Sequence, residues 1–403
     1  MTARIDVLVA DDSDLASAKT SAGAALLLET PQPLNGARKS CARLGENLLA
    51  DVSAAFSSGL NTSLAFEVFT SRLPSDRILW VAQPPRSHHQ KAGCKAVDVH
   101  GSIHDVDCRA RLPVLCSQTA QPSNATYADT SPRVQVAQKV GSQTLIGYRD
   151  ALTFRFMGIR FAQEPKRFTY SKVFDRATGT NKALQPAPYC LQVPYNTNNV
   201  NGSTDCLFLN IWTTKLPAPK PAAKPRLRPV MVYIYGGAFI NGDASDPTFD
   251  GGVQASRGDV VVVAISYRLS TLGFLTFNDG VHNGNYWLSD CISGLQWVQK
   301  YITAFGGDPS KVTIYGESAG AQTVYALLES PKAKGLFHSA ILQSTYSLPY
   351  GTIEASTTQF TEPILQQTGC NTSSDPLKCL STYNASALVA LNTVARYASH
   401  WRS

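Results

Sequence analysis

The residue of this sequence best placed to do chemistry is a serine between two glycines. Ser318 lies in the segment GESAG (residues 316–320), after an alternating β-branched run and before a run of helical character. Glycines two positions to either side remove Cβ atoms that would clash where a strand turns sharply into a helix. Such a turn presents the hydroxyl beside helix N–H groups that stabilise an oxyanion. An ordinary glycine-rich turn is the alternative, and the flanking strand and helix favour a nucleophile.

A second glycine-rich turn follows an earlier apolar strand. The run VMVYIY (residues 230–235) ends in Gly236 and Gly237, followed by Ala238 and Phe239. Small residues here let backbone amides approach a substrate oxygen. This turn is therefore predicted to supply the other half of an oxyanion hole.

Both turns need a sheet to position them. Apolar strands alternate with amphipathic helices through this half of the chain, which predicts an α/β fold with a mostly parallel sheet covered by helices on both faces. The predicted strands are residues 230–235, 260–266, 312–315 and 339–343, and the predicted helices are residues 289–304 and 322–328.

Long motifs in this order resemble the carboxylesterase type B family, which includes cholinesterases and fungal lipases. The resemblance covers residues 134–403 and rests on FMGIRFAQEPKRF, DCLFLNIW, VMVYIYGGAFINGDAS, AISYRLSTLGFL, LQWVQKYITAFGGDPSKVTIYGESAGA and GLFHSAILQS. It implies an α/β-hydrolase that cleaves small-molecule or lipid carboxylic esters through an acyl-enzyme, with no cofactor. Ser318 would be the nucleophile, and Gly237, Ala238 and the Ala319 amide would form the oxyanion hole.

The resemblance also implies two disulfides and shows two departures from the family pattern. The implied pairs are Cys190–Cys206 and Cys370–Cys379. Ala238 replaces the third glycine that the family usually has, so its methyl group should narrow the pocket. Cys291 stands where the family commonly has glutamine, and we expect a buried free thiol.

A base for Ser318 is harder to find. In this fold the acid and the histidine follow the serine along the chain, and only His338 and His400 do so. His338 lies at the entry to a strand, and His400 would need the tail to fold back over the sheet edge. The later acids have no family counterpart as the triad acid; they are Glu329, Glu354, Glu362 and Asp375. We therefore expect the triad acid and histidine beyond residue 403, a sheet incomplete at its C-terminal side, and an impaired or inactive 403-residue chain.

The N-terminal part is predicted to be a small, disulfide-bonded α+β domain. Residues 1–29 show no defined pattern, and residues 118–133 form a polar linker. Residues 30–117 carry ARKSCARLGENLLA, ILWVAQPP and DCRARLPVLC, and on these stretches they resemble a C-type lectin-like domain. The resemblance implies the pairs Cys41–Cys116 and Cys94–Cys108. The calcium signature of such domains is absent, because Gln83 is followed by two prolines and no carboxylate.

Charge and histidines suggest few other partners. The net charge is +7, much of it in the proline-rich segment KLPAPKPAAKPRLRP (residues 215–229). We interpret this segment as a solvated loop, the alternative being a patch for an anionic surface, and no nucleic-acid module is recognisable. No apolar run approaches the roughly 18 residues that a membrane helix needs. No metal is expected, because four histidines lack a ligand pattern and are interpreted as surface residues: His88, His89, His100 and His104.

Cysteines and sequons indicate the secretory pathway. Eight of the nine cysteines fall in the four pairs above, and five N-x-S/T sequons lie at Asn61, Asn124, Asn201, Asn371 and Asn384. No signal peptide is evident, so we expect an incomplete or wrongly assigned start. Two rivals to a secreted esterase remain open: a non-catalytic binding or adhesion protein that keeps the fold, and a carbohydrate-binding protein based on the N-terminal domain. The oligomeric state is also left open.

Overall fold

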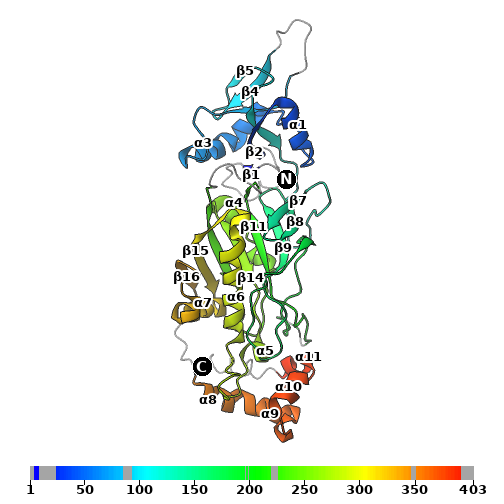
Figure 1. Ribbon diagram of the computed structural model, residues 1–403, viewed down its shortest axis with the longest axis vertical. Coiled ribbons are helices and arrows are strands. Elements are labelled where there is room, and N and C mark those ends of the chain that lie inside the picture. Colours follow the sequence, from blue (N-terminus) through cyan, green and yellow to red (C-terminus); the bar gives the residue numbers. More distant parts are fainter. Residues whose placement is uncertain are drawn as a thin grey trace.

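The computed structural model describes residues 4–8, 24–84, 93–195, 197, 199–218, 226–345 and 351–391. The N-terminal domain lies at one end of the long axis, and the large sheet occupies the middle (Figure 1). Four short helices lie at the other end: α8 (Ile353–Ser356), α9 (Glu362–Thr368), α10 (Pro376–Thr382) and α11 (Ala385–Ala390). None of the helices in these described ranges is both long and apolar enough to span a membrane.

Within its described residues, the N-terminal domain has a seven-stranded sheet and three short helices, as expected of an α+β domain. The sheet order is β12-β1-β2-β6-β3-β4-β5. The predicted boundary at residue 30 falls inside β2, so the sheet begins well before it. The strands are β1 (Ile5–Leu8), β2 (Ala25–Gln32), β3 (Ile78–Trp80), β4 (Cys94–Asp98), β5 (Ile103–Val106) and β6 (Leu112–Ser117), and the helices are α1 (Leu34–Ala42), α2 (Val52–Ala55) and α3 (Asn61–Phe69).

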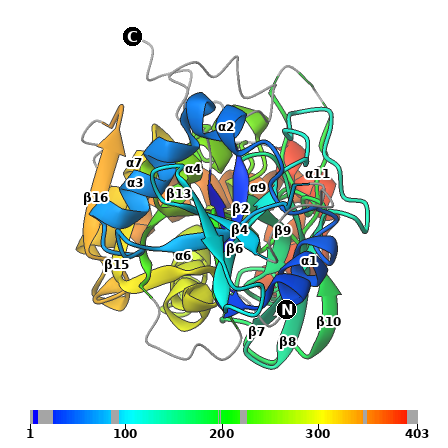
Figure 2. The same cartoon turned by 90° about the horizontal axis from the view of Figure 1, so that it is seen from above.

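One strand of this sheet comes from the other domain. β12 (Lys215–Leu216) pairs antiparallel with β1, with Lys215 opposite Asp6. Seen from above, the N-terminal domain lies over the end of the larger domain (Figure 2). The two domains are therefore joined by backbone hydrogen bonds as well as by side chains.

The second sheet has nine strands in the order β10-β8-β9-β11-β14-β13-β15-β16, with β7 paired to β8. β14, β13, β15 and β16 are parallel, as the apolar runs predicted. The other half is antiparallel: β7 pairs with β8, β8 with β9, and β9 with β11. Short hairpins rather than helices connect β7, β8 and β9, which favours antiparallel pairing. The prediction of a mostly parallel sheet therefore holds only for the half that carries Ser318. Their bounds are β7 (Gln135–Val140), β8 (Gln143–Arg149), β9 (Phe154–Arg160), β10 (Gly179–Lys182), β11 (Phe208–Thr213), β13 (Arg228–Ile234), β14 (Val261–Ile265), β15 (Gly307–Glu317) and β16 (Ser339–Gln343).

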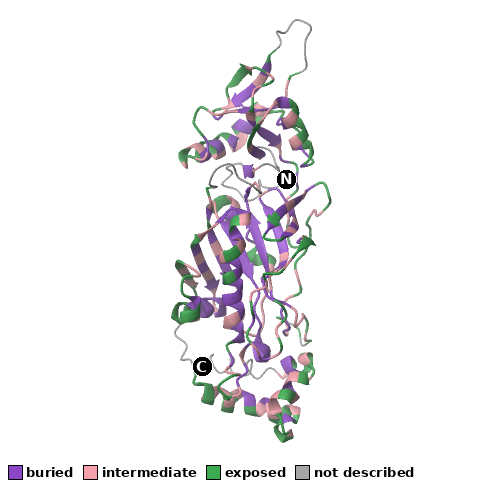
Figure 3. Ribbon diagram, viewed as in Figure 1, coloured by how far each residue is buried: buried purple, intermediate pink, exposed green. Residues whose placement is uncertain are grey.

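Helices cover the parallel strands, and the buried residues concentrate in the two sheets and in α6 (Figure 3). α6 carries Ile292, Leu295 and Val298 on its buried side, as its periodicity predicted. It begins three residues earlier than predicted, after Asn285, whose φ of 58° turns the chain into the helix. The helices between β13 and β16 in the described chain are α4 (Gly252–Gly258), α5 (Ser270–Phe274), α6 (Tyr286–Tyr301) and α7 (Ala319–Glu329).

The two ends of the basic segment are buried beside carboxylates, so the prediction of a solvated loop is wrong for these ends. Lys215 is buried and donates to Asp6 Oδ2 at 2.8 Å and to Glu29 Oε1 at 2.9 Å. Arg228 is also buried and donates to Asp259 Oδ1 at 2.5 Å. Composition could not reveal these carboxylates, because they come from distant parts of the sequence. Residues 219–225 lie outside the described ranges.

Candidate active site

Ser318 is the single residue between β15 and α7. Its backbone has φ 54° and ψ −120°, a conformation that side-chain-bearing residues rarely adopt. A Cβ at Gly316 would lie 2.5 Å from the carbonyl carbon of Gly320, and one at Gly320 would lie 2.1 Å from the carbonyl oxygen of Ile234. Both glycines are therefore required by close backbone approach, for the reason inferred from the sequence.

The 236–242 loop lies directly beside this turn. A Cβ at Gly236 would lie 2.5 Å from the Glu317 carbonyl oxygen and 3.3 Å from Ser318 Cβ. The loop bends through three successive left-handed residues: Gly237 (φ 109°), Ala238 (φ 55°) and Phe239 (φ 62°).

Free backbone amides occur where the sequence predicted them. Among the described residues, the N–H groups of Gly237, Ala238 and Ala319 donate no hydrogen bond. Ala319 is the first residue of α7, where the helix leaves its N–H groups unsatisfied and partly positive. The structure thus brings together the two segments that carry the predicted oxyanion-hole residues.

Aromatic side chains missed in the sequence support the 236–242 loop. The Phe239 ring contacts Phe274 and Trp287 with centroid distances of 5.1 and 5.2 Å, and the Phe239 carbonyl accepts a hydrogen bond from the Ser270 amide at 2.8 Å. Beneath the loop, the stacked rings of Tyr235 and Tyr267 exchange hydrogen bonds with each other's carbonyls at 2.9 and 2.6 Å. Spacing alone gives no signal for these contacts.

Burial also shifts the protonation of groups near the loop. The pKa of Asp243 is raised to about 6, first because the carboxyl is buried and then because Asp246 is close. The pKa values of Tyr235 and Tyr267 lie well above the usual range because both phenols are completely buried. These tyrosines are therefore neutral structural supports, whereas Asp243 titrates near physiological pH.

The histidine after Ser318 that the structure describes lies beside the middle of β15, away from Ser318. His338 exchanges hydrogen bonds with the backbone of Val312, at 2.8 and 3.3 Å. Ser318 lies six residues after Val312, which is about 20 Å along an extended strand. His400 lies outside the described ranges. In the part of the chain that the structure describes, no histidine is hydrogen-bonded to Ser318.

The acids that follow Ser318 also make no hydrogen bond with it in the described ranges. Asp375 instead accepts from the Lys378 amide and caps α10. Glu354 and Glu362 lie in the first turns of α8 and α9, and Glu329 ends α7.

The implied disulfides are all present. The structure joins Cys190 to Cys206, Cys370 to Cys379, Cys41 to Cys116 and Cys94 to Cys108. Cys291 is a buried free thiol on α6, and burial, then the nearby Asp290, raises its pKa well above the usual value. It is therefore protonated and unreactive at neutral pH.

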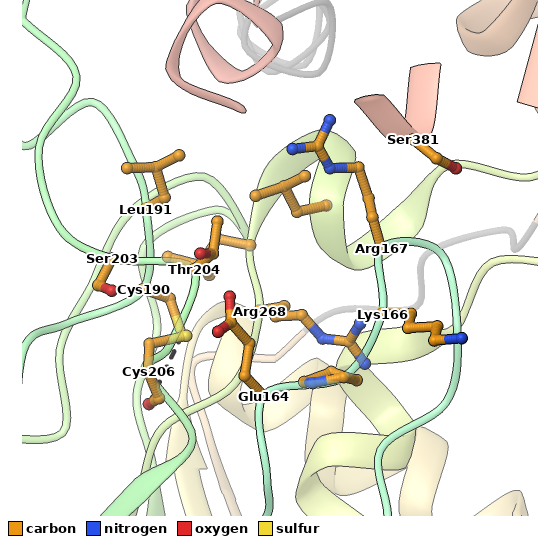
Figure 4. A pocket seen from close by; sticks show the side chains of 13 residues that line it. Glu164, Lys166, Arg167, Cys190, Leu191, Ser203, Thr204, Cys206, Arg268 and Ser381 are labelled. Atoms are coloured by element: carbon orange, nitrogen blue, oxygen red, sulfur yellow. Dashed lines mark hydrogen bonds between the residues drawn. A yellow bond between two sulfur atoms is a disulfide. The ribbon is translucent and has the colours of Figure 1, made fainter. Parts of the chain in front are cut away.

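A cavity of about 360 Å³ lies near the Cys190–Cys206 disulfide and does not include Ser318 (Figure 4). Its walls come from the disulfide loop, the segment before Phe168, and the start of α5. The lining residues are Glu164, Pro165, Lys166, Arg167, Cys190, Leu191, Ser203, Thr204, Cys206, Arg268, Leu269, Leu272 and Ser381.

The histidines of the N-terminal domain form no metal site within the described ranges, where no group of three or more potential ligands occurs. His104 Nε2 lies 2.9 Å from Asp98 Oδ2, an ordinary surface pair. His88 and His89 lie outside the described residues.

Known proteins resemble this chain over its second part. The sequence model of the carboxylesterase family matches residues 133–401. Human carboxylesterase 3 is 36% identical over 303 residues, covering 70% of this chain and 52% of the relative, and mouse bile salt-activated lipase is 41% identical over 200 residues, covering 48% and 33%.

Solved structures agree with this match. A PNB esterase has a TM-score of 0.56 at 32% identity, covering 65% of this chain and 54% of its own. The carboxylesterase of Geobacillus stearothermophilus has the same TM-score at 34% identity, covering 64% and 53%. The chain thus spans about half the length of human carboxylesterase 3 and of the PNB esterase. By its sequence motifs, its α/β-hydrolase sheet and these matches, the chain belongs to the carboxylesterase family.

Proposed function

We propose that this chain carries the nucleophile and oxyanion hole of a serine carboxylic ester hydrolase. The observation that carries this proposal is the strained Ser318 turn packed against the 236–242 loop, with unbonded amides on both sides. The names of its relatives, carboxylesterase and bile salt-activated lipase, support small-molecule or lipid esters as the substrate class.

In the proposed reaction, Ser318 Oγ attacks the ester carbonyl carbon and loses its proton to a base. The carbonyl oxygen becomes an oxyanion that accepts hydrogen bonds from the amides of Gly237, Ala238 and Ala319. Collapse expels the alcohol, which takes up a proton, and leaves an acyl group on Ser318. Water then releases the carboxylic acid and regenerates the serine. The methyl group of Ala238 narrows the acyl side of this site.

We further propose that the 403-residue chain, expressed as it stands, turns over esters poorly. Activation of serine needs a positioned base, and no described histidine is bonded to Ser318. Loss of one triad member costs on the order of 10⁴- to 10⁶-fold in kcat. The oxyanion hole would nevertheless remain, so Ser318 should still react when a base is added.

Chemical rescue tests this proposal. The chain is treated with a fluorophosphonate probe with and without imidazole, and modified residues are mapped by mass spectrometry. We expect slow labelling at Ser318 that rises with imidazole concentration and is absent in Ser318→Ala. No labelling of Ser318 at any imidazole concentration would instead favour a non-catalytic binding protein with the same fold. Rapid, Ser318-dependent hydrolysis of p-nitrophenyl acetate without imidazole would contradict the impaired state.

A calcium-dependent lectin function for the N-terminal domain receives no support from its contacts. The Gln83 side-chain amide donates to the carbonyls of Val81 and Lys95, both at 2.8 Å, and accepts from the Lys95 amide at 2.7 Å. Its polar atoms are therefore used inside the domain. The resemblance to a lectin-like fold remains a prediction, and glycan-array binding by the whole chain would test a carbohydrate-binding role.

We also propose that the protein is a secreted glycoprotein. All five sequon asparagines are exposed, and four disulfides stabilise the chain. Expression through a secretory pathway should give a mass that falls on N-glycosidase treatment. An unchanged mass would contradict glycosylation.

A further inference from the structure

The 236–242 loop has an unfavourable backbone conformation, and its amides must be placed accurately. Two residues with side chains, Ala238 and Phe239, have positive φ, and Gly242 at the end of the loop has φ 125°. Conformations of this kind persist only where the surroundings impose them. The loop must also hold its amides accurately, since misplacement by about 1 Å costs on the order of 10²-fold in rate.

Gln192 holds the far end of this loop from outside it. Its side-chain Nε2 donates to the Gly242 carbonyl at 2.8 Å, and its Oε1 accepts from the Gly242 amide at 2.8 Å. Nε2 also donates to the Cys190 carbonyl at 3.1 Å, and the residue is 4% exposed. One buried amide therefore satisfies both backbone groups of Gly242, which leaves that residue little freedom to move.

Gly242 transmits this restraint towards Ser318. A Cβ at Gly242 would lie 2.4 Å from the Tyr235 ring and 2.5 Å from the Gly236 carbonyl oxygen, so Gly242 packs directly on the start of the loop. Gly236 in turn lies against Ser318. A shift of Gly242 would therefore displace the turn that carries the nucleophile.

The segment that carries Gln192 is itself anchored. Gln192 lies two residues after Cys190, whose disulfide with Cys206 closes a short loop. The backbone of Gln192 exchanges hydrogen bonds with the backbone of Asn201 at 2.9 and 3.0 Å. Cys190 and Leu191 line the cavity shown in Figure 4, so packing is incomplete on that side of the loop. The hydrogen bonds of Gln192 link the disulfide loop to the 236–242 loop.

We propose that Gln192 is a positioning residue, which holds the oxyanion amides in place for acylation of Ser318 by clamping Gly242. This inference rests on the proposed function. It assigns to the disulfide loop a role in the geometry of the oxyanion hole.

The test compares two matched variants of the whole chain. Gln192→Met keeps the length of the side chain but removes its hydrogen bonds. Gln299→Met is the control, because Gln299 also bridges two backbone carbonyls, those of Pro309 and Leu336 at 2.8 and 2.9 Å, but away from the 236–242 loop. Two properties are measured: hydrogen–deuterium exchange of peptides covering residues 236–242, and imidazole-assisted fluorophosphonate labelling of Ser318, separated into maximal rate and half-saturating probe concentration.

We expect Gln192→Met alone to increase exchange in residues 236–242 and to lower the maximal labelling rate by about 10- to 100-fold, with little change in half-saturation. Unchanged exchange, or increased exchange with an unchanged labelling rate, would overturn the proposal. If the wild-type chain is not labelled at Ser318, the proposed esterase function fails, and the exchange result alone decides whether Gln192 clamps the loop.

Discussion

Three single residues at the candidate nucleophile have strained backbones. Ser318, Ala238 and Phe239 all carry side chains at positive φ, and they lie in two adjoining turns. Strain of this kind is inferred to have a function when it coincides with free hydrogen-bond donors, as it does here. The glycines around these residues allow backbone segments to pack closely, so a glycine-to-alanine substitution tests this packing directly.

Gly320→Ala should be strongly destabilising, because its Cβ would lie 2.1 Å from the Ile234 carbonyl oxygen. We expect the free energy of unfolding to fall by about 1–3 kcal/mol, with loss of Ser318 labelling. Urea denaturation measures the first effect. Gly258→Ala is the matched control, since a Cβ there meets nothing closer than 3.5 Å. Equal stability of the two variants would contradict the close approach.

Among the helices and strands of the N-terminal domain, two disulfides close loops of very different length. Cys41–Cys116 joins α1 to β6 across 75 residues, whereas Cys94–Cys108 closes a loop of only 14. In the chain-entropy account, the longer loop gives the greater stabilisation, about 4.5 against about 3 kcal/mol.

Replacing Cys41 and Cys116 together by alanine should therefore lower stability by roughly 1.5 kcal/mol more than replacing Cys94 and Cys108. Each double variant avoids leaving a free thiol, so the two can be compared directly by chemical denaturation. A larger loss from the short loop would indicate that local packing, rather than loop closure, sets the contribution of these bonds.

At the scale of the whole molecule, the two domains meet through buried charge. Lys215 and Asp6 each have side chains only 1% exposed, and Glu29 is 16% exposed. A second buried pair, Arg149 with Glu46 at 2.7 Å, crosses the same boundary. Removing one partner of a buried ion pair lowers protein stability far more than removing one partner of a surface pair.

Lys215→Ala should cost about 3–5 kcal/mol, because Asp6 would remain buried without its closest cation. Lys300→Ala removes an exposed pair with Asp175 and should change stability by less than about 1 kcal/mol. Both are measured by equilibrium denaturation. Similar losses of stability in the two variants would mean that the domain boundary is hydrated in solution.

The same cluster predicts a pH dependence. Burial, followed by the nearby charge of Asp6, raises the pKa of Glu29 from 4.5 to about 8. The folded state therefore binds more protons than the unfolded state between these values, so this group's contribution to stability is full below pH 4.5 and is lost as pH rises towards 8. Glu29→Gln should flatten the stability profile across this window. An unchanged slope in the variant would show that Glu29 ionises normally.

Local patterns predicted the family, the parallel strands and the place of Ser318 between a strand and a helix, because these features depend on neighbouring residues. The GESAG turn, the apolar runs and the glycine spacing each describe steric needs that neighbouring residues impose on one another. β16 agrees with its predicted residues, and β13 and β14 agree to within two residues, whereas β15 begins five residues before the predicted strand.

Which distant side chains meet could be seen only in the folded chain. The contacts concerned join segments between 50 and 211 residues apart: the pairing of β1 with β12, the burial of Lys215 among carboxylates, and the hydrogen bonds of Gln192 to Gly242. A basic residue in a proline-rich segment looks solvated until its partners are placed beside it. Pattern and propensity act over a few residues, whereas burial and hydrogen bonding depend on the packing of the whole chain.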